Sequence, residues 1–161
     1  NYQMDAWSYV YGTEVTVNLF SLHAQEILHN TSALVEESVY MRAITALADS
    51  QIANKWAYFD DDPFAQLVFL DQIRLGFPEL NWMIWTELMR RYREMPQSEW
   101  DALDNDLIRR DHFMTMLCDI TQTDLTPHFE AWTIDVSDDA KTSCSAYPVL
   151  LQEIWNINGA E

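Results

Sequence analysis

Apolar residues recur three and four positions apart along most of the chain, and glycine or proline stands between these segments. In the first half, one helix is expected to start just after Gly12 and a second just after Thr31. The dipeptide Asp62-Pro63 is typical of an N-cap followed by the first helical residue. The first half should therefore form long helices over residues 13–28, 32–59 and 63–76.

The second half shows the same spacing, with its clearest stripe of apolar residues ending at Pro96. Ser98 and Asp101 resemble a capping box in which Asp101 replaces the usual glutamate, and they predict the start of one long helix. Pro127 indicates a short helix, and the pattern becomes less regular from Ser137 onward. Further helices are thus expected over residues 80–95, 98–117 and 126–132.

The composition is that of one globular domain: 161 residues, 48% hydrophobic and 22% charged, with no repeat or linker. We expect residues 1–161 to form a single mainly α unit, a compact multi-helix bundle. The formal charge of −17 would repel nucleic-acid phosphates and anionic lipid alike, so neither is an expected partner. No apolar run approaches the roughly 20 residues of a membrane-spanning helix, and no signal peptide precedes the first predicted helix. A start at Asn1 rather than Met suggests a mature or excised product.

The chain has two cysteines, Cys118 and Cys144, which are too few for a disulfide-rich scaffold and lack the spacing of a metal site. They could form one disulfide in an exported protein, or they could be two buried thiols. The sequence leaves both interpretations open.

The first predicted helix carries a narrow wedge of polar residues. Glu14, Asn18, Ser21, Gln25 and His29 fall within roughly 80° around the helix axis. Such groups could face a protein cavity, where the carboxylate would need a metal ion or hydrogen-bond donors, or they could form the solvent side of the helix. From the spacing alone, the solvent side is favoured. Apolar residues flank the wedge on both sides: Val15, Leu19 and Leu22 on one, and Val17, Ala24 and Leu28 on the other.

The histidines offer a second candidate for metal chemistry. Glu26 and His29 have the Glu-x-x-His spacing of di-iron bundles, and His23 lies three residues before Glu26. Such bundles need a second copy of the motif, which the chain lacks, and His112 and His128 lie outside any ligand pattern. A self-contained metal-binding bundle on Glu26 and His29 is therefore a minor alternative to surface or capping roles.

Two further groups of residues have structural explanations. Arg90, Arg91 and Arg93 lie in the last turn of a predicted helix, where positive charge favours the helix dipole; binding of an acidic glycan is the weaker alternative. Several tryptophans could stack on sugars, but their places in apolar stripes favour core packing. These tryptophans are Trp56, Trp85, Trp100 and Trp132.

The segment from Gly12 to Leu22, Gly-Thr-Glu-Val-Thr-Val-Asn-Leu-Phe-Ser-Leu, resembles the stretch after the zinc-binding helix of enhancin-like, mucin-degrading zinc metallopeptidases, a gluzincin family. Asn1-Tyr2-Gln3 resembles the residues after the second histidine of that family's His-Glu-x-Gly-His motif. Thr133 departs from the family, which often has glycine there. Further similar segments follow in the family's order at residues 69–77, 91–96 and 124–132. The resemblance covers residues 1–137 and leaves 138–161 as a C-terminal extension.

The resemblance implies that Glu14 is the third zinc ligand and that Asn18 orients a ligand. It places both histidine ligands and the general-base glutamate upstream of Asn1, so no catalytic residue would lie within this chain. The implied protein is a secreted or cell-surface zinc peptidase that cleaves glycoproteins such as mucins. The fragment alone should bind zinc weakly, lack activity and expose apolar surface that the upstream part of the polypeptide covers. The alternative is a non-catalytic or degenerate peptidase-like helical domain that binds glycoprotein or protein partners.

Overall fold

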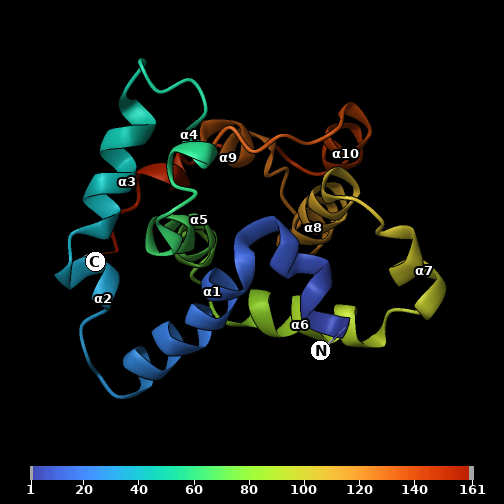
Figure 1. The fold of residues 1–161 in the computed structure, drawn as a ribbon, viewed down its shortest axis with the longest axis horizontal. Coiled ribbons are helices and arrows are strands. Elements are labelled where there is room, and N and C mark those ends of the chain that lie inside the picture. Colours follow the sequence, from blue (N-terminus) through green and yellow to red (C-terminus); the bar gives the residue numbers. More distant parts are fainter. Residues whose placement is uncertain (1, 160–161) are drawn as a thin grey trace.

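A computed structural model of the chain describes the backbone of residues 2–159 and the side chains of residues 15–159. This part is mainly α and forms a compact multi-helix bundle, as predicted, with ten α-helices, one 3-10 helix and no strand (Figure 1). No helix in it is both long and apolar enough to cross a bilayer. In chain order the helices are α1 (Tyr2–Ile27), α2 (Ala33–Glu36), α3 (Val39–Ala48), α4 (Lys55–Tyr58), α5 (Pro63–Gly76), α6 (Met83–Glu94), α7 (Gln97–Ala102), α8 (Asp106–Thr121), α9 (Thr126–Ala131), α10 (Asp138–Cys144) and the 3-10 helix η1 (Ile154–Asn156).

Helices α5 and α8 are the two centres of packing. Helix α5 contacts α1, α3 and η1, and α8 contacts α1, α6 and α10. Every side chain from Ala65 to Ile73 is buried, which is expected of a helix enclosed by its neighbours. On α8, Phe113 and Leu117 are fully buried in the same core. Helix α1 bridges the two centres because it packs against both.

The sequence predicted the start and end of α5 correctly. The Asp62 carboxylate accepts a hydrogen bond from the Ala65 amide at 3.1 Å, which makes Asp62 the N-cap. Pro63 is the first helical residue, and the helix ends at Gly76. The stripe that closes at Pro96 is also confirmed, as helix α6.

The predicted start of the first helix was wrong. Helix α1 begins at Tyr2 and continues through Gly12, whereas the prediction began it at residue 13. A glycine inside a helix costs only about 1 kcal/mol relative to alanine, which favourable neighbours offset. The predicted end near residue 28 agrees with the observed end at Ile27.

Two long predicted helices are broken in the structure. The segment expected as one helix to residue 59 is divided into α2, α3 and α4: Ser38 adopts a left-handed conformation with φ 56°, and the Asn54 side chain caps α4. The segment expected from Ser98 is divided into α7 and α8, and Ser98 lies inside α7 instead of capping a helix. Asn105 caps α8 by accepting a hydrogen bond from the Ile108 amide at 3.0 Å. Asparagine side chains compete with the helix backbone for hydrogen bonds, so Asn54 and Asn105 interrupt an apolar pattern that continues past them.

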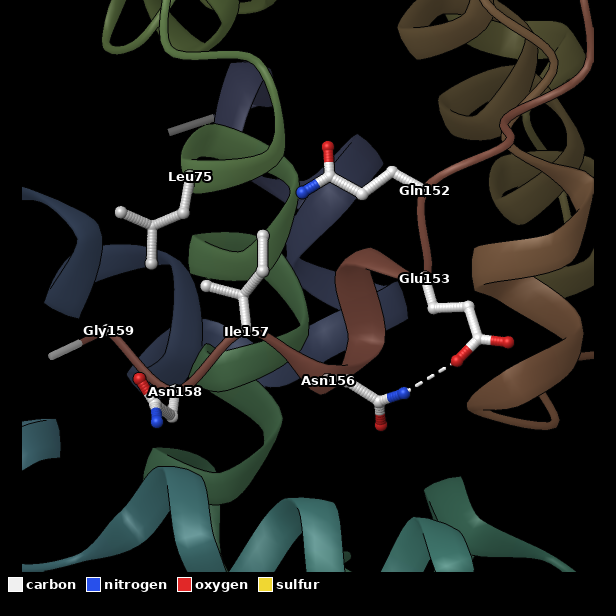
Figure 2. Close-up of a pocket in the computed structure, with 7 residues that line it drawn as sticks. All are labelled: Leu75, Gln152, Glu153, Asn156, Ile157, Asn158 and Gly159. Atoms are coloured by element: carbon white, nitrogen blue, oxygen red, sulfur yellow. Dashed lines mark hydrogen bonds between the residues drawn. The ribbon is translucent and has the colours of Figure 1, made fainter. Parts of the chain in front are cut away.

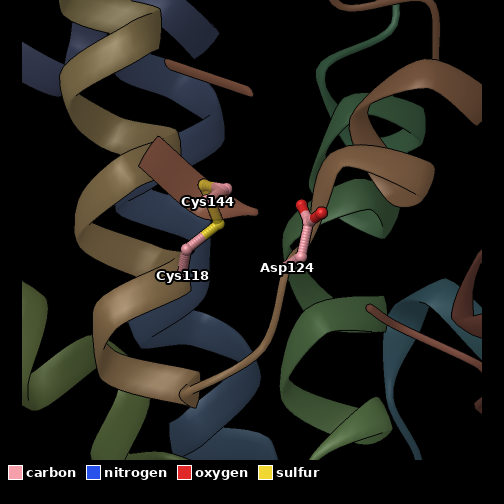
Figure 3. Close-up of side chains that lie close together, drawn as sticks. All are labelled: Cys118, Asp124 and Cys144. Atoms are coloured by element: carbon pink, nitrogen blue, oxygen red, sulfur yellow. A yellow bond between two sulfur atoms is a disulfide. The ribbon is translucent and has the colours of Figure 1, made fainter. Parts of the chain in front are cut away.

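The C-terminal segment, irregular in sequence, is ordered by contacts with the helices before it. Cys118 on α8 and Cys144 on α10 form a disulfide with their Cα atoms 5.6 Å apart (Figure 3). The open question about these cysteines is therefore answered: they are bonded. An isolated parallel bridge also joins Asp124 to Val149.

Candidate functional site on helix α1

One face of α1 belongs to the core of the bundle. Val15, Thr16, Leu19 and Leu22 are buried where α1 packs against α5 and α8. Their spacing of three and four residues is that of one helix face, which fixes the rotation of α1 about its axis. No wedge residue whose side chain is described belongs to this buried face.

The two residues assigned to the metal site lie on this helix. The backbone of Glu14 is part of α1, but its side chain falls outside the residues whose side chains the structure describes. Asn18, one turn later, is half-buried and interacts with neighbouring groups. The roles of Glu14 as a zinc ligand and Asn18 as its positioning residue remain predictions.

Of the remaining wedge residues, two face solvent and one contacts the start of α2. Ser21 and His29 are exposed, as the solvent-side interpretation expects. Gln25 is half-buried, and its side-chain oxygen accepts a hydrogen bond from the Ala33 amide at 3.2 Å, at the start of α2. The C-terminal end of the wedge therefore does not line a cavity.

Helix α1 has a second apolar face that no described residue covers fully. Val17 is 43% exposed, Phe20 54%, Ile27 61% and Leu28, in the turn directly after the helix, 68%, whereas Val15 on the opposite face is 1% exposed. We call the four exposed residues the open face of α1. A helix that is apolar on two sides is typical of an element between two packed layers.

An arginine on α5 anchors the C-terminal half of α1. The Arg74 guanidinium bonds the Asp71 carboxylate at 2.6 Å, the Glu26 carboxylate of α1 at 3.1 Å and the Asn81 side-chain oxygen at 2.9 Å. It also lies 4.5 Å from the centroid of the Trp82 ring. Trp82 in turn donates a hydrogen bond from Nε1 to Glu26 at 2.9 Å. Guanidinium planes suit this combination of paired carboxylates and an aromatic face.

The same cluster reaches α3 through a buried tyrosine. The Tyr40 hydroxyl donates a short hydrogen bond to Asp71. Burial raises the pKa of Tyr40, and the charge of Asp71 raises it further, so the phenol stays protonated. Burial by itself would lower the pKa of Arg74, but the bond to Asp71 keeps it above its ordinary value. Arg74 therefore stays charged, and its ion pairs together with the Tyr40 hydrogen bond join α1, α3 and α5.

This anchor corrects the alternative of a self-contained metal bundle. Glu26, which the spacing proposed as a ligand, is already bonded to Arg74 and Trp82. His29 is exposed and lies beyond the end of α1, with φ 55°. The sequence contained one signal for the anchor, an acid and an arginine three apart at Asp71 and Arg74, but their partner Glu26 is 48 positions away in the chain.

Among the described side chains, one group brings three candidate ligand atoms within 4.8 Å of one another: Cys118, Asp124 and Cys144 (Figure 3). Both sulfurs are joined in the disulfide, and metal ions bind the thiolate form of cysteine. One Asp124 oxygen also accepts a hydrogen bond from the Thr126 amide at 2.9 Å. This group is therefore a structural crosslink and not a metal site.

The tryptophans have the core-packing role predicted, and two arginines of the cluster form ion pairs. Arg90 pairs with Glu87 at 2.7 Å, and Arg91 bridges Glu87 at 2.8 Å and Asp119 at 2.5 Å. The pair of Arg91 with Asp119 joins α6 to α8, and carboxylates already neutralise Arg90 and Arg91. Among the tryptophans, Trp85 and Trp132 are buried in the core, while Trp56 and Trp100 pack against it.

Comparison with solved structures supports the helical architecture. A crystal structure of a functionally unknown conserved protein from Bacillus anthracis str. Ames matches with a TM-score of 0.66 and 24% identity, over 88% of this chain and 28% of that one. A mutant of a functionally unknown conserved protein from the same organism matches with a TM-score of 0.67 and 23% identity, over 90% and 29%. The chain thus spans under a third of either solved chain, and the likeness concerns the fold alone.

No curated protein matches the sequence. A family match covers residues 1–133, and the family is described as peptidase M60, enhancin and enhancin-like. That range includes α1 through α9 and the whole Arg74 anchor. Because the match extends over most of its length, the chain belongs to the peptidase M60 family of enhancin and enhancin-like proteins.

Proposed function

We propose that this chain is the helical C-terminal portion of a zinc metallopeptidase domain that cleaves glycoproteins such as mucins. The observation that carries the proposal is the family match over residues 1–133, in which the segment around Glu14 resembles the part that supplies the third zinc ligand. Bound zinc would lower the pKa of a water molecule and so prepare it to attack a peptide carbonyl.

The donor set in this chain suits one ligand position and not a complete site. Glu14 offers a carboxylate oxygen, which is an ordinary zinc ligand, and a catalytic zinc takes three protein ligands. Among the described side chains, no three free ligands come together. In the proposal, the histidine ligands and the general-base glutamate come from the upstream part of the same polypeptide, and Asn18 orients a ligand from one turn further along α1.

The open face of α1 supports this division of the site. Val17, Phe20 and Ile27 leave apolar surface on the helix that carries Glu14. The two similar solved chains are more than three times as long as the part that this chain matches, so proteins of this fold contain further polypeptide. We assign the cover of the open face to the upstream part of the protein, including its zinc-binding helix.

The disulfide supports placement outside the cytoplasm. Disulfides form and persist in oxidising compartments and are rare in reducing ones. The bond between Cys118 and Cys144 is therefore in keeping with a secreted or cell-surface enzyme, where glycoprotein substrates are found.

Calorimetric zinc titration of residues 1–161 beside a protein extended upstream tests the proposal. The extended protein should bind one zinc tightly and cleave a mucin-type glycoprotein, and the shorter chain should do neither. In the extended protein, Glu14→Gln should abolish both properties. Glu36→Gln is the matched control, because it neutralises an exposed carboxylate on α2.

Tight stoichiometric zinc binding by residues 1–161 alone would contradict the assignment, as would full activity of Glu14→Gln. If the upstream sequence lacks His-Glu-x-x-His, the alternative of a degenerate peptidase-like domain that binds glycoprotein replaces the enzyme.

A further inference from the structure

Residues 138–159, which we call the strap, lie beyond the family match at residues 1–133 and yet pack into the same bundle. Helix α10 packs against α8, and η1 packs against α5 and α9. Asp124 and the strap exchange backbone hydrogen bonds, with Pro148 accepting at 2.8 Å and Leu150 donating at 3.1 Å. Tyr147 donates a hydrogen bond to Asp119 at 2.5 Å.

A buried amide on α5 depends on the strap for its partners. Gln72 is fully buried, and its side-chain NH2 group donates to the carbonyls of Trp155 at 2.8 Å and Ile157 at 3.2 Å. Its side-chain oxygen accepts a hydrogen bond from Trp132 Nε1 at 3.0 Å. If the strap left, both donors would lose their partners in the interior, which is costly unless water replaces them.

Two glycine positions fit the strap closely. A Cβ atom on Gly76 would lie 2.6 Å from Cγ2 of Ile154, which is itself fully buried. Gly159, with φ 67°, lies against the Tyr40 ring, where a Cβ atom would be 2.5 Å from a ring carbon. Any larger residue at these positions would displace the strap.

Between these contacts the strap leaves space. Figure 2 shows Leu75 of α5 facing the residues that follow η1, around a cavity of about 370 Å³. Polar residues of the strap also line it: Gln152, Glu153, Asn156 and Asn158. The strap thus sits on α5 through a few close contacts and not through continuous packing.

The disulfide is the covalent link between the strap and the helices before it. Cys118 and Cys144 are both fully buried, so a reductant reaches the sulfurs only during brief local opening between α10 and α8, and the bond reforms the closed state unless it is reduced.

We propose that residues 138–159 act as a redox-locked strap: oxidation of Cys118 and Cys144 closes the strap on α5 and α8, and reduction by a dithiol allows it to lift. Closing joins two thiols into one S–S bond and passes two electrons and two protons to an oxidised dithiol. Opening reverses this: the dithiol supplies both electrons and both protons and becomes a disulfide itself. The lock therefore closes in an oxidising compartment and stays open in a reducing one. The proposal is independent of the zinc assignment.

Hydrogen exchange of the oxidised and dithiothreitol-reduced chain tests the lock. After reduction, amides of the strap and of α5 near Gln72 should exchange about tenfold faster or more, while those of α6 should change little. The double variant Cys118→Ala/Cys144→Ala should show the fast pattern without reductant and no response to it. Unchanged exchange in the strap after reduction, or equal acceleration in α6, would overturn the proposal.

Substitution at Gly76 tests the contact between α5 and the strap separately from the disulfide. Gly76→Ala should lower Tm by about 5 °C, because the new methyl group collides with Ile154, although alanine favours the helix by itself. Ile154→Ala also lowers Tm, and the double variant should lose less than the sum of the two single variants. Ser98→Ala, on exposed α7, is the control and should leave Tm unchanged. Additive losses, or an unchanged Tm in Gly76→Ala, would show that the strap does not depend on the contact between Gly76 and Ile154.

Discussion

Helices α5 and α1 are both rich in apolar residues, but neighbours enclose α5, whereas described residues cover only one side of α1. On α5 the whole stretch from Ala65 to Ile73 is buried, including polar residues that have partners. On α1 the buried face of Val15 and Leu19 lies opposite the open face with Phe20. The difference separates a helix that holds the bundle together from one whose second side is available to another layer of protein.

The largest loss of stability should come from removing a buried side chain of the enclosed helix α5. Phe69→Ala removes a fully buried ring that packs against His128, Phe129 and Trp132, and should lower the free energy of unfolding by about 4 kcal/mol. Phe20→Ala makes the same chemical change on the open face and should cost under about 1 kcal/mol. Urea unfolding of both variants measures the contrast. Equal losses would show that the open face is packed after all.

The Arg74 anchor joins the two helices and should give the next largest effect. Arg74→Ala leaves the buried Asp71 carboxylate without its cation and should cost about 3 kcal/mol in urea unfolding. Arg90→Ala removes an exposed arginine whose pairs lie on the surface of α6, and should have a far smaller effect because solvent screens those pairs. A cost for Arg74→Ala no greater than that for Arg90→Ala would mean that α1 is held by packing alone.

A histidine beside α5 predicts how stability varies with pH. Burial lowers the pKa of His128 from 6.5 to about 3, although its bond to the Phe69 carbonyl favours the charged form. Between these values the unfolded chain binds a proton that the folded chain does not, so this group makes stability fall as pH falls.

The expected slope from His128 approaches about 1.4 kcal/mol per pH unit between pH 6 and 4. Urea unfolding at several pH values measures the total slope. His128→Gln should reduce this slope by the contribution of about one proton. His29→Gln, at an exposed position, should leave the slope unchanged. If the slope is the same in His128→Gln, other groups cause the loss of stability at low pH.

The smallest change in stability is expected on the open face itself. Phe20→Ser/Leu28→Ser should leave Tm nearly unchanged but reduce binding of a hydrophobic dye or self-association, because both residues are more than half exposed. Leu107→Ser on α8, which is less exposed, is the control. Undiminished dye binding would place the exposed apolar surface elsewhere on the molecule.

The sequence predicted those parts of the fold that local chemistry determines. Asp62 and Pro63 predict the start of α5, because an N-cap and the fixed φ of proline affect only the residues next to them in the chain. The breaks at Ser38 and Asn105 were missed because the apolar spacing continues across them. Ser38 breaks the helix through its left-handed backbone without a side-chain cap, and Asn105 breaks it by capping α8.

Local sequence patterns predicted less of the candidate site, because its contacts join distant segments of the chain. Glu26 has a ligand-like spacing with His29, but its actual partner, Arg74, comes from a distant segment. Thr133 departs from the glycine common in the resembling family and adopts a left-handed φ of 52°. Its hydroxyl accepts a hydrogen bond from the Lys55 amide at 2.7 Å, a compensation that no local pattern reveals.

The place of the disulfide has a practical consequence for anyone who shortens the protein. A chain cut after residue 133, where the family match ends, keeps Cys118 and loses Cys144. Its single thiol would then lie on a face of α8 that α10 had covered, free to crosslink two molecules in air. Sequence families and folding units can have different ends, and here the second cysteine shows that the folding unit extends past the end of the family match.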